Sequence, residues 1–481
     1  MCFVGAVAFQ EGEVAFALRK VARKGEHRSH KSAGMVTYDH DLALPHIVRG
    51  LGMATEVFTP EGLEELKGRI GLAHLRWATA GGLERANIHP LSGNFQGKPF
   101  FLVHNGEISF RRALERQFAT YQPEVTSDTK FFCALIETSG EGNFEDALRY
   151  ALRIVKGTYS LIVLYENTIY AVRDVTENRP LYIGTKEGVV CIGSETLIFR
   201  SLGIHPRQVK EIRGGQLAIV HGADLSIEWK TFEGPSDIAR IPRLCLIEVV
   251  YSMHPANITY GRTVQTLRER LGWQLAQTWR PQADIVVGVP DSGVAAGKGF
   301  SKGSGIPYEE ALIRYHQSGR IFYSRVDERR DMYDIKYDPV IEKLEGQRVV
   351  LIDDTIFASE TIRAVIEIVL EAGAKEVHIG IPAPMIVAPC FYGTPTSSEH
   401  RRLIAKDHGG DQQRILEEIG APFGGRVKSL TFLPLGDVKQ AVVDTKPMVD
   451  GYGDITTRNF CDACFLGGKR HIPVDADGYT M

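Results

Sequence analysis

The second residue of the chain is a cysteine, and its position suits nucleophilic chemistry. Once Met1 is removed, Cys2 carries a thiol and a free α-amine on the same residue. An α-amine has a pKa of about 8 and can act as the base that takes the proton from the thiol. A cysteine at position 2 occurs often by chance, so the assignment depends on what the rest of the sequence supplies.

Three motifs that follow in order supply the other groups that an amide-hydrolysing thiol needs. HLRWATAGG places Arg76 at the end of an expected strand, and the planar guanidinium of arginine can bind both oxygens of a carboxylate. HNGEI offers the Asn105 side-chain amide and the Gly106 N–H as donors to an oxyanion. TSDTKFF places Asp128 at a helix start, where it can pair with an amine. A structural Arg76–Asp128 ion pair and a turn at Asn105-Gly106 are the alternative interpretation.

Cys2 with FVG, RWATAGG, HNGEI and SDTKFF together resemble the glutaminase domain of class II glutamine amidotransferases. The resemblance implies an α+β N-terminal-nucleophile hydrolase with a four-layer α/β/β/α fold. It also implies the role of each residue. Cys2 would be the nucleophile, and Asn105 and Gly106 would stabilise the tetrahedral oxyanion. Arg76 and Asp128 would bind the α-carboxylate and the α-ammonium of glutamine.

A second group of polar residues lies where two expected strands end. RVVLI runs into two carboxylates, and DIVVGVP runs into a short polar loop; the residues are Asp353 and Asp354, and Asp291, Ser292 and Gly293. Ligands of parallel α/β sheets bind at the carboxyl ends of the strands, so both loops are expected to line one site. A carboxylate pair after a buried strand favours ligand binding over an exposed turn.

Motifs along nearly the whole chain, among them RPLYIG, LCLIEVVYSMHPANI, DIVVGVPDSG and CDACFLGGK, resemble amidophosphoribosyltransferases that carry an iron–sulfur cluster. These enzymes form phosphoribosylamine from glutamine and phosphoribosyl pyrophosphate (PRPP), which opens purine synthesis. The resemblance implies a type I phosphoribosyltransferase fold and an ammonia path from Cys2. It implies that PRPP is bound by Asp291, Ser292, Gly293, Arg329, Lys336, Asp353, Asp354 and Thr361, with Mg²⁺ at Ser292, Asp353 and Asp354.

The chain has seven cysteines, and the resemblance assigns four of them to a [4Fe–4S] cluster: Cys245, Cys390, Cys461 and Cys464. The C-x-x-C pair alone suits zinc as well, because thiolate ligands do not separate the two metals. We expect a structural cluster that fastens the C-terminal tail to the transferase domain.

The loop after the two aspartates departs from the family pattern Ser-Ile-Val-Arg-Gly-Thr-Thr. It reads TIFASET, so Ser359 replaces the glycine that lets a backbone approach a phosphate, and Ala358 replaces the arginine. Glu360 adds negative charge near the expected 5′-phosphate. Three interpretations stay open: an amidophosphoribosyltransferase with an unusual loop, an amidotransferase with another acceptor, and a regulatory paralogue without phosphoribosyl transfer.

The strands and helices expected to hold these groups follow a different order in each of three successive regions of the chain. Residues 1–235 contain many short strands and few helices, which is typical of a layered α+β domain. Strands and helices alternate in residues 236–445, which predicts an α/β domain with a parallel sheet. Residues 446–481 form a C-terminal segment that carries two of the cluster cysteines.

The net charge and the length of the apolar runs limit the kinds of partner that the protein is expected to bind. The 481 residues carry a net charge of −3, which gives no sign of binding to nucleic acid or to a lipid surface. No apolar run reaches the roughly 18 residues that a membrane span needs. We therefore expect a cytoplasmic enzyme with reduced thiols. Its partners would be glutamine and PRPP, and the family implies a homo-oligomer, a dimer or tetramer.

Overall fold

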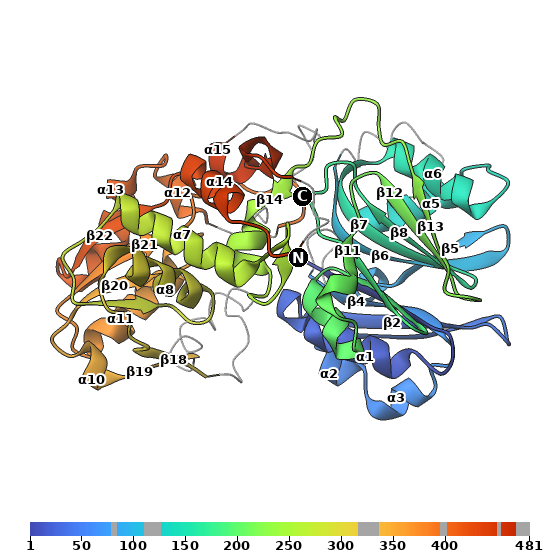
Figure 1. Ribbon diagram of the computed structural model, residues 1–481, viewed down its shortest axis with the longest axis horizontal. Coiled ribbons are helices and arrows are strands. Elements are labelled where there is room, and N and C mark those ends of the chain that lie inside the picture. Colours follow the sequence, from blue (N-terminus) through green and yellow to red (C-terminus); the bar gives the residue numbers. More distant parts are fainter. Residues whose placement is uncertain (78–83, 110–126, 316–335, 395–401, 450–453, 468–481) are drawn as a thin grey trace.

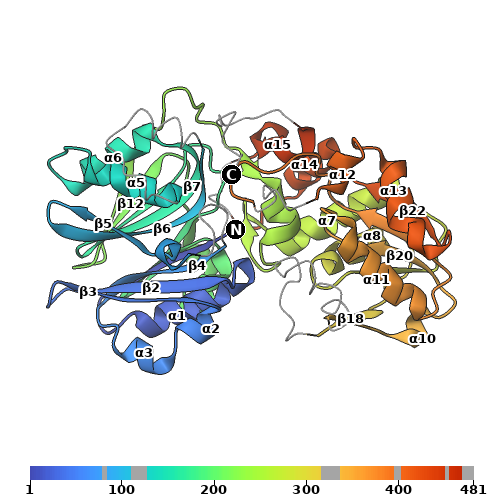
Figure 2. The same ribbon diagram turned by 180° about the vertical axis from the view of Figure 1, so that it is seen from behind.

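The computed structural model describes residues 1–77, 84–109, 127–315, 336–394, 402–449 and 454–467 (Figures 1 and 2). The chain forms two lobes, and the N-terminus lies where they meet. We call the part up to residue 231 the first half and the part from residue 244 the second half. Residues 232–243 between them contain no helix or strand, and the predicted domain boundary at residue 235 falls there.

The first half is built on two antiparallel sheets that face each other. The first has seven strands in the order β11 (Val209–Glu211), β9 (Tyr182–Lys186), β10 (Val189–Gly193), β1 (Phe3–Phe9), β4 (Ile70–Arg76), β2 (Ser32–Asp39) and β3 (Leu44–Leu51). The second has six, in the order β13 (Ile227–Thr231), β12 (Gln216–His221), β8 (Thr168–Arg173), β7 (Lys156–Tyr165), β6 (Lys98–Ser109) and β5 (Leu91–Phe95).

Alternating side chains on the strands produce separate apolar layers. On β1, Val4 and Ala6 belong to the core between the two sheets, whereas Phe3 and Val7 pack toward helix α1 (Ala15–Lys24). A third core lies between the second sheet and helices α5 (Asp128–Glu137) and α6 (Phe144–Ile154). Three cores separate four layers, so the predicted α/β/β/α fold is confirmed.

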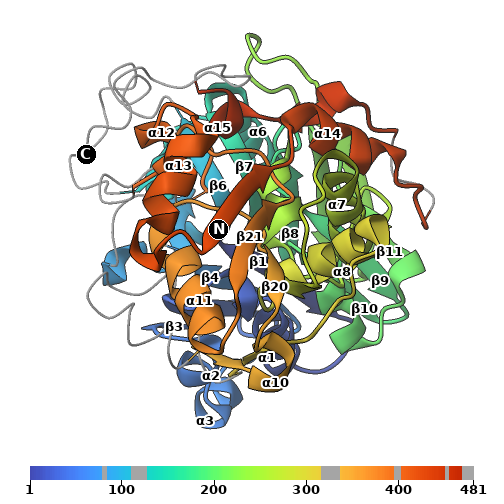
Figure 3. The same cartoon turned by 90° about the vertical axis from the view of Figure 1, so that its left-hand side faces the viewer.

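The second half contains a parallel sheet in the order β17 (Ile285–Gly288), β20 (Arg348–Ile352), β21 (Glu376–Ile381) and β22 (Val427–Phe432), seen from its side in Figure 3. Its larger helices are α7 (Val264–Thr278), α8 (Ser292–Ser304), α11 (Ser359–Glu371), α13 (Gln412–Gly420) and α14 (Leu435–Asp444). One continuous apolar core joins these helices to the sheet, which confirms the predicted α/β class. Helix α11 starts at Ser359, inside the loop segment TIFASET.

The second half also contains smaller elements: β15 (Ile258–Thr259), β16 (Arg262–Thr263), β18 (Leu312–Arg314), β19 (Tyr337–Pro339), α10 (Ile341–Leu344), α12 (Ile404–Asp407) and α15 (Ala463–Leu466). Strand β14 (Leu244–Cys245) pairs in parallel with β23 (Phe460–Cys461), so the C-terminal segment is joined to the start of the second half. Among the described residues, no helix is both long and apolar enough to cross a lipid bilayer.

Candidate active sites

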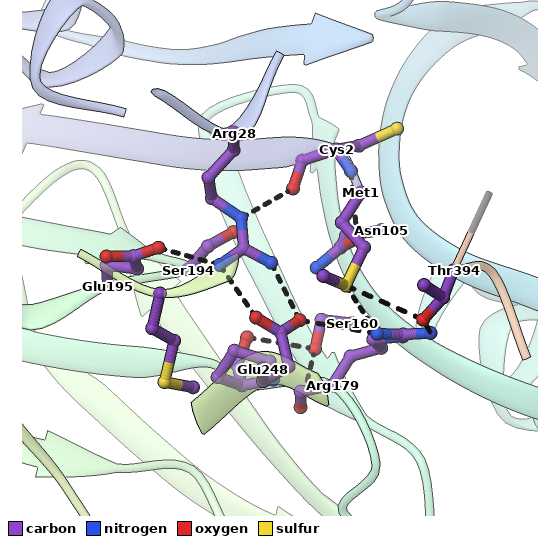
Figure 4. Close-up of polar contacts among 12 residues, drawn as sticks. Met1, Cys2, Arg28, Asn105, Ser160, Arg179, Ser194, Glu195, Glu248 and Thr394 are labelled. Atoms are coloured by element: carbon purple, nitrogen blue, oxygen red, sulfur yellow. Dashed lines mark hydrogen bonds and ion pairs between the residues drawn. The ribbon is translucent and has the colours of Figure 1, made fainter. Parts of the chain in front are cut away.

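Cys2 lies at the end of the first sheet, beside the last residues of β4. The Trp77 N–H donates to the Cys2 sulfur across 3.3 Å, and the Cys2 N–H donates to Asn105 Oδ1 across 3.2 Å. Figure 4 shows Asn105 directly beside Met1 and Cys2. Asn105 Nδ2 is buried and has no hydrogen-bond partner among the described residues. The side chain that binds the Cys2 nitrogen thus keeps an amide donor available to an oxyanion.

Gly106 lies inside strand β6 and not in a turn, because it pairs with Tyr159 of β7 in an unbroken antiparallel register. Its φ angle is +153°, and a Cβ atom built on it would lie 1.9 Å from the Thr158 carbonyl oxygen. No side chain fits there, so this stretch of β6 has the close backbone contact and the conformation that only glycine permits.

Arg76 is the last residue of β4, and Asp128 is the first residue of α5. Asp128 begins helix α5 and accepts hydrogen bonds from the backbone N–H groups of Ile108 (3.0 Å) and Thr129 (2.9 Å). Burial lowers the pKa of Arg76, and the negative charges of Cys2 and Asp128 counteract that shift. The structure therefore brings Arg76, Asp128 and Cys2 within electrostatic range of one another.

We expect Gly106→Ala to lower kcat for a reaction at Cys2 about 100-fold or more, because the shift of β6 would move the Gly106 N–H, a predicted oxyanion donor, out of position. The added methyl group must displace β6 from Thr158, and we expect a loss of about 3 kcal/mol or more of unfolding free energy. Gly140→Ala is the matched control, since Gly140 has φ +73° but nothing within 4 Å of its Cβ position. Steady-state kinetics and thermal unfolding of both variants test this, and equal kinetics in both would contradict it.

Asp353 and Asp354 follow β20 and are both buried. The Asp354 N–H donates to Asp353 Oδ1 across 2.8 Å, so the two carboxylates belong to one tight turn. Burial and the neighbouring Asp354 raise the pKa of Asp353 well above its ordinary value, while Lys336 acts in the opposite direction. A Cβ on Gly293 would lie 2.3 Å from the Ile352 carbonyl oxygen, so the two predicted loops do meet at this end of the sheet.

The other predicted PRPP residues lie on several elements of the second half. Ser292 is the first residue of α8, and Thr361 lies in the first turn of α11. The Asp291 side chain is half exposed and forms an ion pair with Arg314 of β18. Arg329 lies outside the described residues.

The carboxylate that the sequence placed near the 5′-phosphate points into solvent. Glu360 is exposed, whereas Ser359 is buried and lies 3.1 Å from Oε1 of a different carboxylate, Glu418. Burial would raise the pKa of Glu418, but hydrogen bonds from His408, Arg402 and Ser359 lower it to about 2. Glu418 is therefore a paired anion, and sequence analysis did not foresee its contact with the start of α11.

The four cysteines assigned to a cluster lie on the β14–β23 pair, on α15 and on the segment before Tyr392. Cys245 and Cys461 are register partners, Cys464 lies in α15, and the Tyr392 N–H donates to the Cys390 sulfur across 3.3 Å. Burial raises the pKa of Cys464, and the charges of Cys390, Cys461 and Cys245 raise it further. In the ranges that the structure describes, no three His, Cys, Asp or Glu residues are arranged to hold a metal ion.

Comparison with known proteins identifies the family. Residues 74–201 match the glutamine amidotransferase domain family, and residues 258–384 match the phosphoribosyl transferase domain family. The amidophosphoribosyltransferase of Methanothermobacter thermautotrophicus is 34% identical over 465 residues, which cover 94% of this chain and 90% of that protein. The chain belongs to the amidophosphoribosyltransferase family. The Bacillus subtilis member is 33% identical over 451 residues, with 92% of this chain and 88% of the relative covered.

A solved structure supports the same conclusion for the fold. The B. subtilis glutamine PRPP amidotransferase, determined with ADP and GMP, matches this structure with a TM-score of 0.86 at 30% identity. The match covers 99% of both chains. The resemblance to the amidophosphoribosyltransferase family is confirmed. Membership of the iron–sulfur subfamily stays a prediction.

Sequence analysis missed a buried charge network beneath Cys2. Arg28 donates from Nε to the Cys2 carbonyl oxygen across 3.0 Å, and its guanidinium also contacts Glu195 and Glu248. Arg28 lies 167 residues from Glu195 and 220 from Glu248 in the chain, and no local motif surrounds it. Only the fold of this amidophosphoribosyltransferase brings these three side chains together.

Proposed function

We propose that this protein hydrolyses glutamine at Cys2 and transfers the ammonia to PRPP, forming 5-phosphoribosylamine in the first step of purine synthesis. The observation that carries the glutaminase part is the unpartnered Nδ2 of Asn105, a side chain whose Oδ1 is hydrogen-bonded to the Cys2 nitrogen, with Arg76 and Asp128 in electrostatic range. A thiol, an oxyanion donor and two charges for the ends of an amino acid are the parts that glutamine hydrolysis needs.

The reaction begins after Met1 has been removed. The Cys2 α-amine takes the thiol proton, and the thiolate attacks the side-chain amide carbon of glutamine. Asn105 Nδ2 and the Gly106 N–H donate to the oxygen that becomes negative. The α-ammonium of Cys2 then returns a proton to the leaving nitrogen, and ammonia departs from a thioester. Water then attacks the thioester while the α-amine takes one of its protons, the C–S bond breaks, and that proton passes to the Cys2 sulfur. Glutamate leaves, and its new carboxyl group gives the other proton to solvent. Arg76 and Asp128 hold the substrate through its α-carboxylate and α-ammonium.

We propose that PRPP binds where the loops after β17 and β20 meet. Asp353 and Asp354 with Ser292 would hold Mg²⁺, and Asp291, Gly293, Arg329, Lys336 and Thr361 would contact PRPP. Two buried adjacent carboxylates suit a divalent cation, because the cation removes the repulsion that raises the pKa of Asp353. When bound, Mg²⁺ supplies neutralising charge for the pyrophosphate leaving group.

The exposed position of Glu360 supports PRPP over a different acceptor. The N-terminus of α11 keeps its favourable dipole for a phosphate, and no Glu360 carboxylate points into the turn at Asp353. The neighbouring Glu418 is neutralised by Arg402 and His408, with distances of 2.7 Å from each. An acceptor other than PRPP remains the second candidate, because Ser359 and Ala358 still depart from the family loop.

We also propose that Cys245, Cys390, Cys461 and Cys464 hold a [4Fe–4S] cluster. The support is the chemistry of the set: four buried or half-buried thiols that influence one another, with the other three cysteines elsewhere. When bound, the cluster would supply a covalent joint between the C-terminal segment and the rest of the second half. All seven thiols are free, which agrees with a reducing compartment such as the cytoplasm. A homo-oligomer is proposed from the family alone.

One experiment tests the function and the cofactors together. Anaerobically purified protein is assayed for glutamine hydrolysis with and without PRPP and Mg²⁺, and phosphoribosylamine is trapped in the same reaction. We expect PRPP to stimulate hydrolysis and trapped product to form. Hydrolysis that ignores PRPP would favour another acceptor. Iron and acid-labile sulfide are measured on the same sample, and zinc without either would reject the iron–sulfur cluster.

A further inference from the structure

The contacts of Glu248 link the second half of the chain to the nucleophile of the first. We propose that Glu248 is a positioning residue for Cys2, acting through Arg28. The inference rests on the proposed glutaminase function of Cys2. It gives that function a determinant from the transferase half of the chain, which lies beyond the residues already assigned to glutamine.

Glu248 is held by a two-point contact. It begins a one-turn helix, Glu248–Ser252, that follows β14. Its Oε1 accepts from Arg28 Nη2 across 2.8 Å, and its Oε2 accepts from Arg28 Nη1 across 3.1 Å. The side chain is 1% exposed, and that of Arg28 is fully buried. A bidentate, buried pair of this kind fixes the orientation of the guanidinium plane.

The third edge of the same guanidinium contacts the nucleophile. Arg28 Nε donates to the Cys2 carbonyl oxygen across 3.0 Å, as Figure 4 shows. Arg28 Nη1 also donates to Glu195 Oε1 across 2.7 Å. Because the guanidinium is rigid and planar, its position on the two carboxylates sets where Nε meets Cys2. Cys2 is thus held from one side by Arg28 and from the other by Asn105.

Glu248 supplies half of the negative charge that faces the buried arginines near Cys2. Arg179 Nη1 lies 3.3 Å from Glu248 Oε1, so two arginines face two carboxylates, Glu195 and Glu248. Without the Glu248 carboxylate, two buried guanidinium groups would face Glu195 alone. Arg28 would then be drawn toward Glu195 and away from its present contact with Cys2.

The network also joins Cys2 to the segments that carry two of the cysteines. Glu248 follows Cys245 by three residues in the chain. Arg179 Nε donates to the carbonyl oxygen of Tyr392 across 3.1 Å, and Tyr392 binds the Cys390 sulfur through its N–H. The second half therefore reaches the nucleophile through defined contacts. Among its described residues, Glu248 is the one that pairs with Arg28.

The test is Glu248→Gln in the full chain. The amide keeps the size of the side chain but turns an N–H toward the guanidinium and removes the charge. We expect kcat for glutamine hydrolysis to fall about 10- to 100-fold, as when a reactive group is displaced by about an ångström. The KM for glutamine should stay near the wild-type value, because Arg76 and Asp128 are untouched. Phosphoribosylamine synthesis from added ammonia should be unchanged.

A matched variant separates positioning from stability. Glu211 is a buried carboxylate of the first half that pairs with Arg173 across 2.7 Å and has no contact with Cys2. We expect Glu211→Gln to lower the melting temperature as Glu248→Gln does, but to leave kcat unchanged. Glu248→Asp, which keeps the charge, should restore part of kcat.

The outcomes distinguish the inference from the function on which it rests. Equal loss of kcat in Glu248→Gln and Glu211→Gln would overturn the positioning role, and so would a wild-type kcat in Glu248→Gln. Loss of ammonia-dependent synthesis together with hydrolysis would also overturn it, because the effect would then be general. A wild-type protein that does not hydrolyse glutamine would instead reject the proposed function itself.

Discussion

Replacing Cys2 by alanine is expected to lower glutamine-dependent synthesis about 10⁴-fold or more, the usual effect of removing a nucleophile. The substitution removes the sulfur that contacts Trp77 and leaves the α-amine and Asn105 in place. Synthesis from added ammonia should persist, because the residues proposed to bind PRPP lie in the second half of the chain. Both rates are measured with the same trapping assay at saturating PRPP and Mg²⁺.

Cys133→Ala provides the control for this prediction. Cys133 is a buried core residue of α5 in the same half, and its thiol has no role in the proposed reaction. We expect it to keep the wild-type rate with glutamine. A Cys2→Ala protein that still hydrolyses glutamine would reject Cys2 as the nucleophile, and a Cys133→Ala protein that does not would point to a general effect of cysteine removal.

Asp353→Asn is expected to abolish phosphoribosyl transfer and at the same time to stabilise the fold. Burial and the neighbouring Asp354 raise the pKa of Asp353 in the folded protein. The folded protein therefore keeps the proton on this carboxyl group to a higher pH than the unfolded chain, in which an aspartate has a pKa of about 3.9. Ionising Asp353 in the folded protein lowers the free energy of unfolding. This loss is absent below pH of about 4 and grows as the pH rises toward the folded pKa. At pH 8 without Mg²⁺ we expect the variant to gain about 1–3 kcal/mol of unfolding free energy.

Thermal unfolding at pH 5 and pH 8, with and without Mg²⁺, measures this effect. Mg²⁺ should raise the melting temperature of the wild type more than that of the variant. Asp284→Asn is the control of opposite sign, because hydrogen bonds from Arg348 lower the pKa of Asp284 to about 2. Its contribution is present above pH of about 4 and is lost as the pH falls toward 2, so this variant should be less stable at pH 8. A destabilised Asp353→Asn at pH 8 would contradict the assignment of Asp353.

The parts of the site that the sequence predicted are those whose chemistry is local. Arg76 ends a strand, Asp128 starts a helix, and Asp353 follows a buried strand, and each of these positions follows from the pattern of neighbouring residues. The two fold classes followed in the same way, from the period of the apolar residues and from the alternation of strands and helices.

What the sequence left unpredicted depends on contacts between distant segments. Periodicity does not show that Arg28 meets Glu248, because side-chain pairing across 220 residues is set by how two lobes dock. The direction of Glu360 was open for a similar reason: a first-turn glutamate of a helix can face the ligand or the solvent. Its exposure follows from the start of α11 at Ser359, which turns Ser359 inward toward Glu418.

The contacts between the two lobes have a consequence for folding during synthesis on the ribosome. The Thr158 hydroxyl, next to the strand that carries Gly106, donates to the Tyr392 carbonyl oxygen across 2.9 Å, a contact that spans 234 residues. Domains fold roughly in the order in which they emerge, so both sheets of the first half can form long before residue 392 is translated. The nascent first half therefore has its thiol before the contact with Tyr392 can form. Arg28 likewise waits for residue 248 to emerge, so the charge network under Cys2 is completed only after both sheets of the first half have been made.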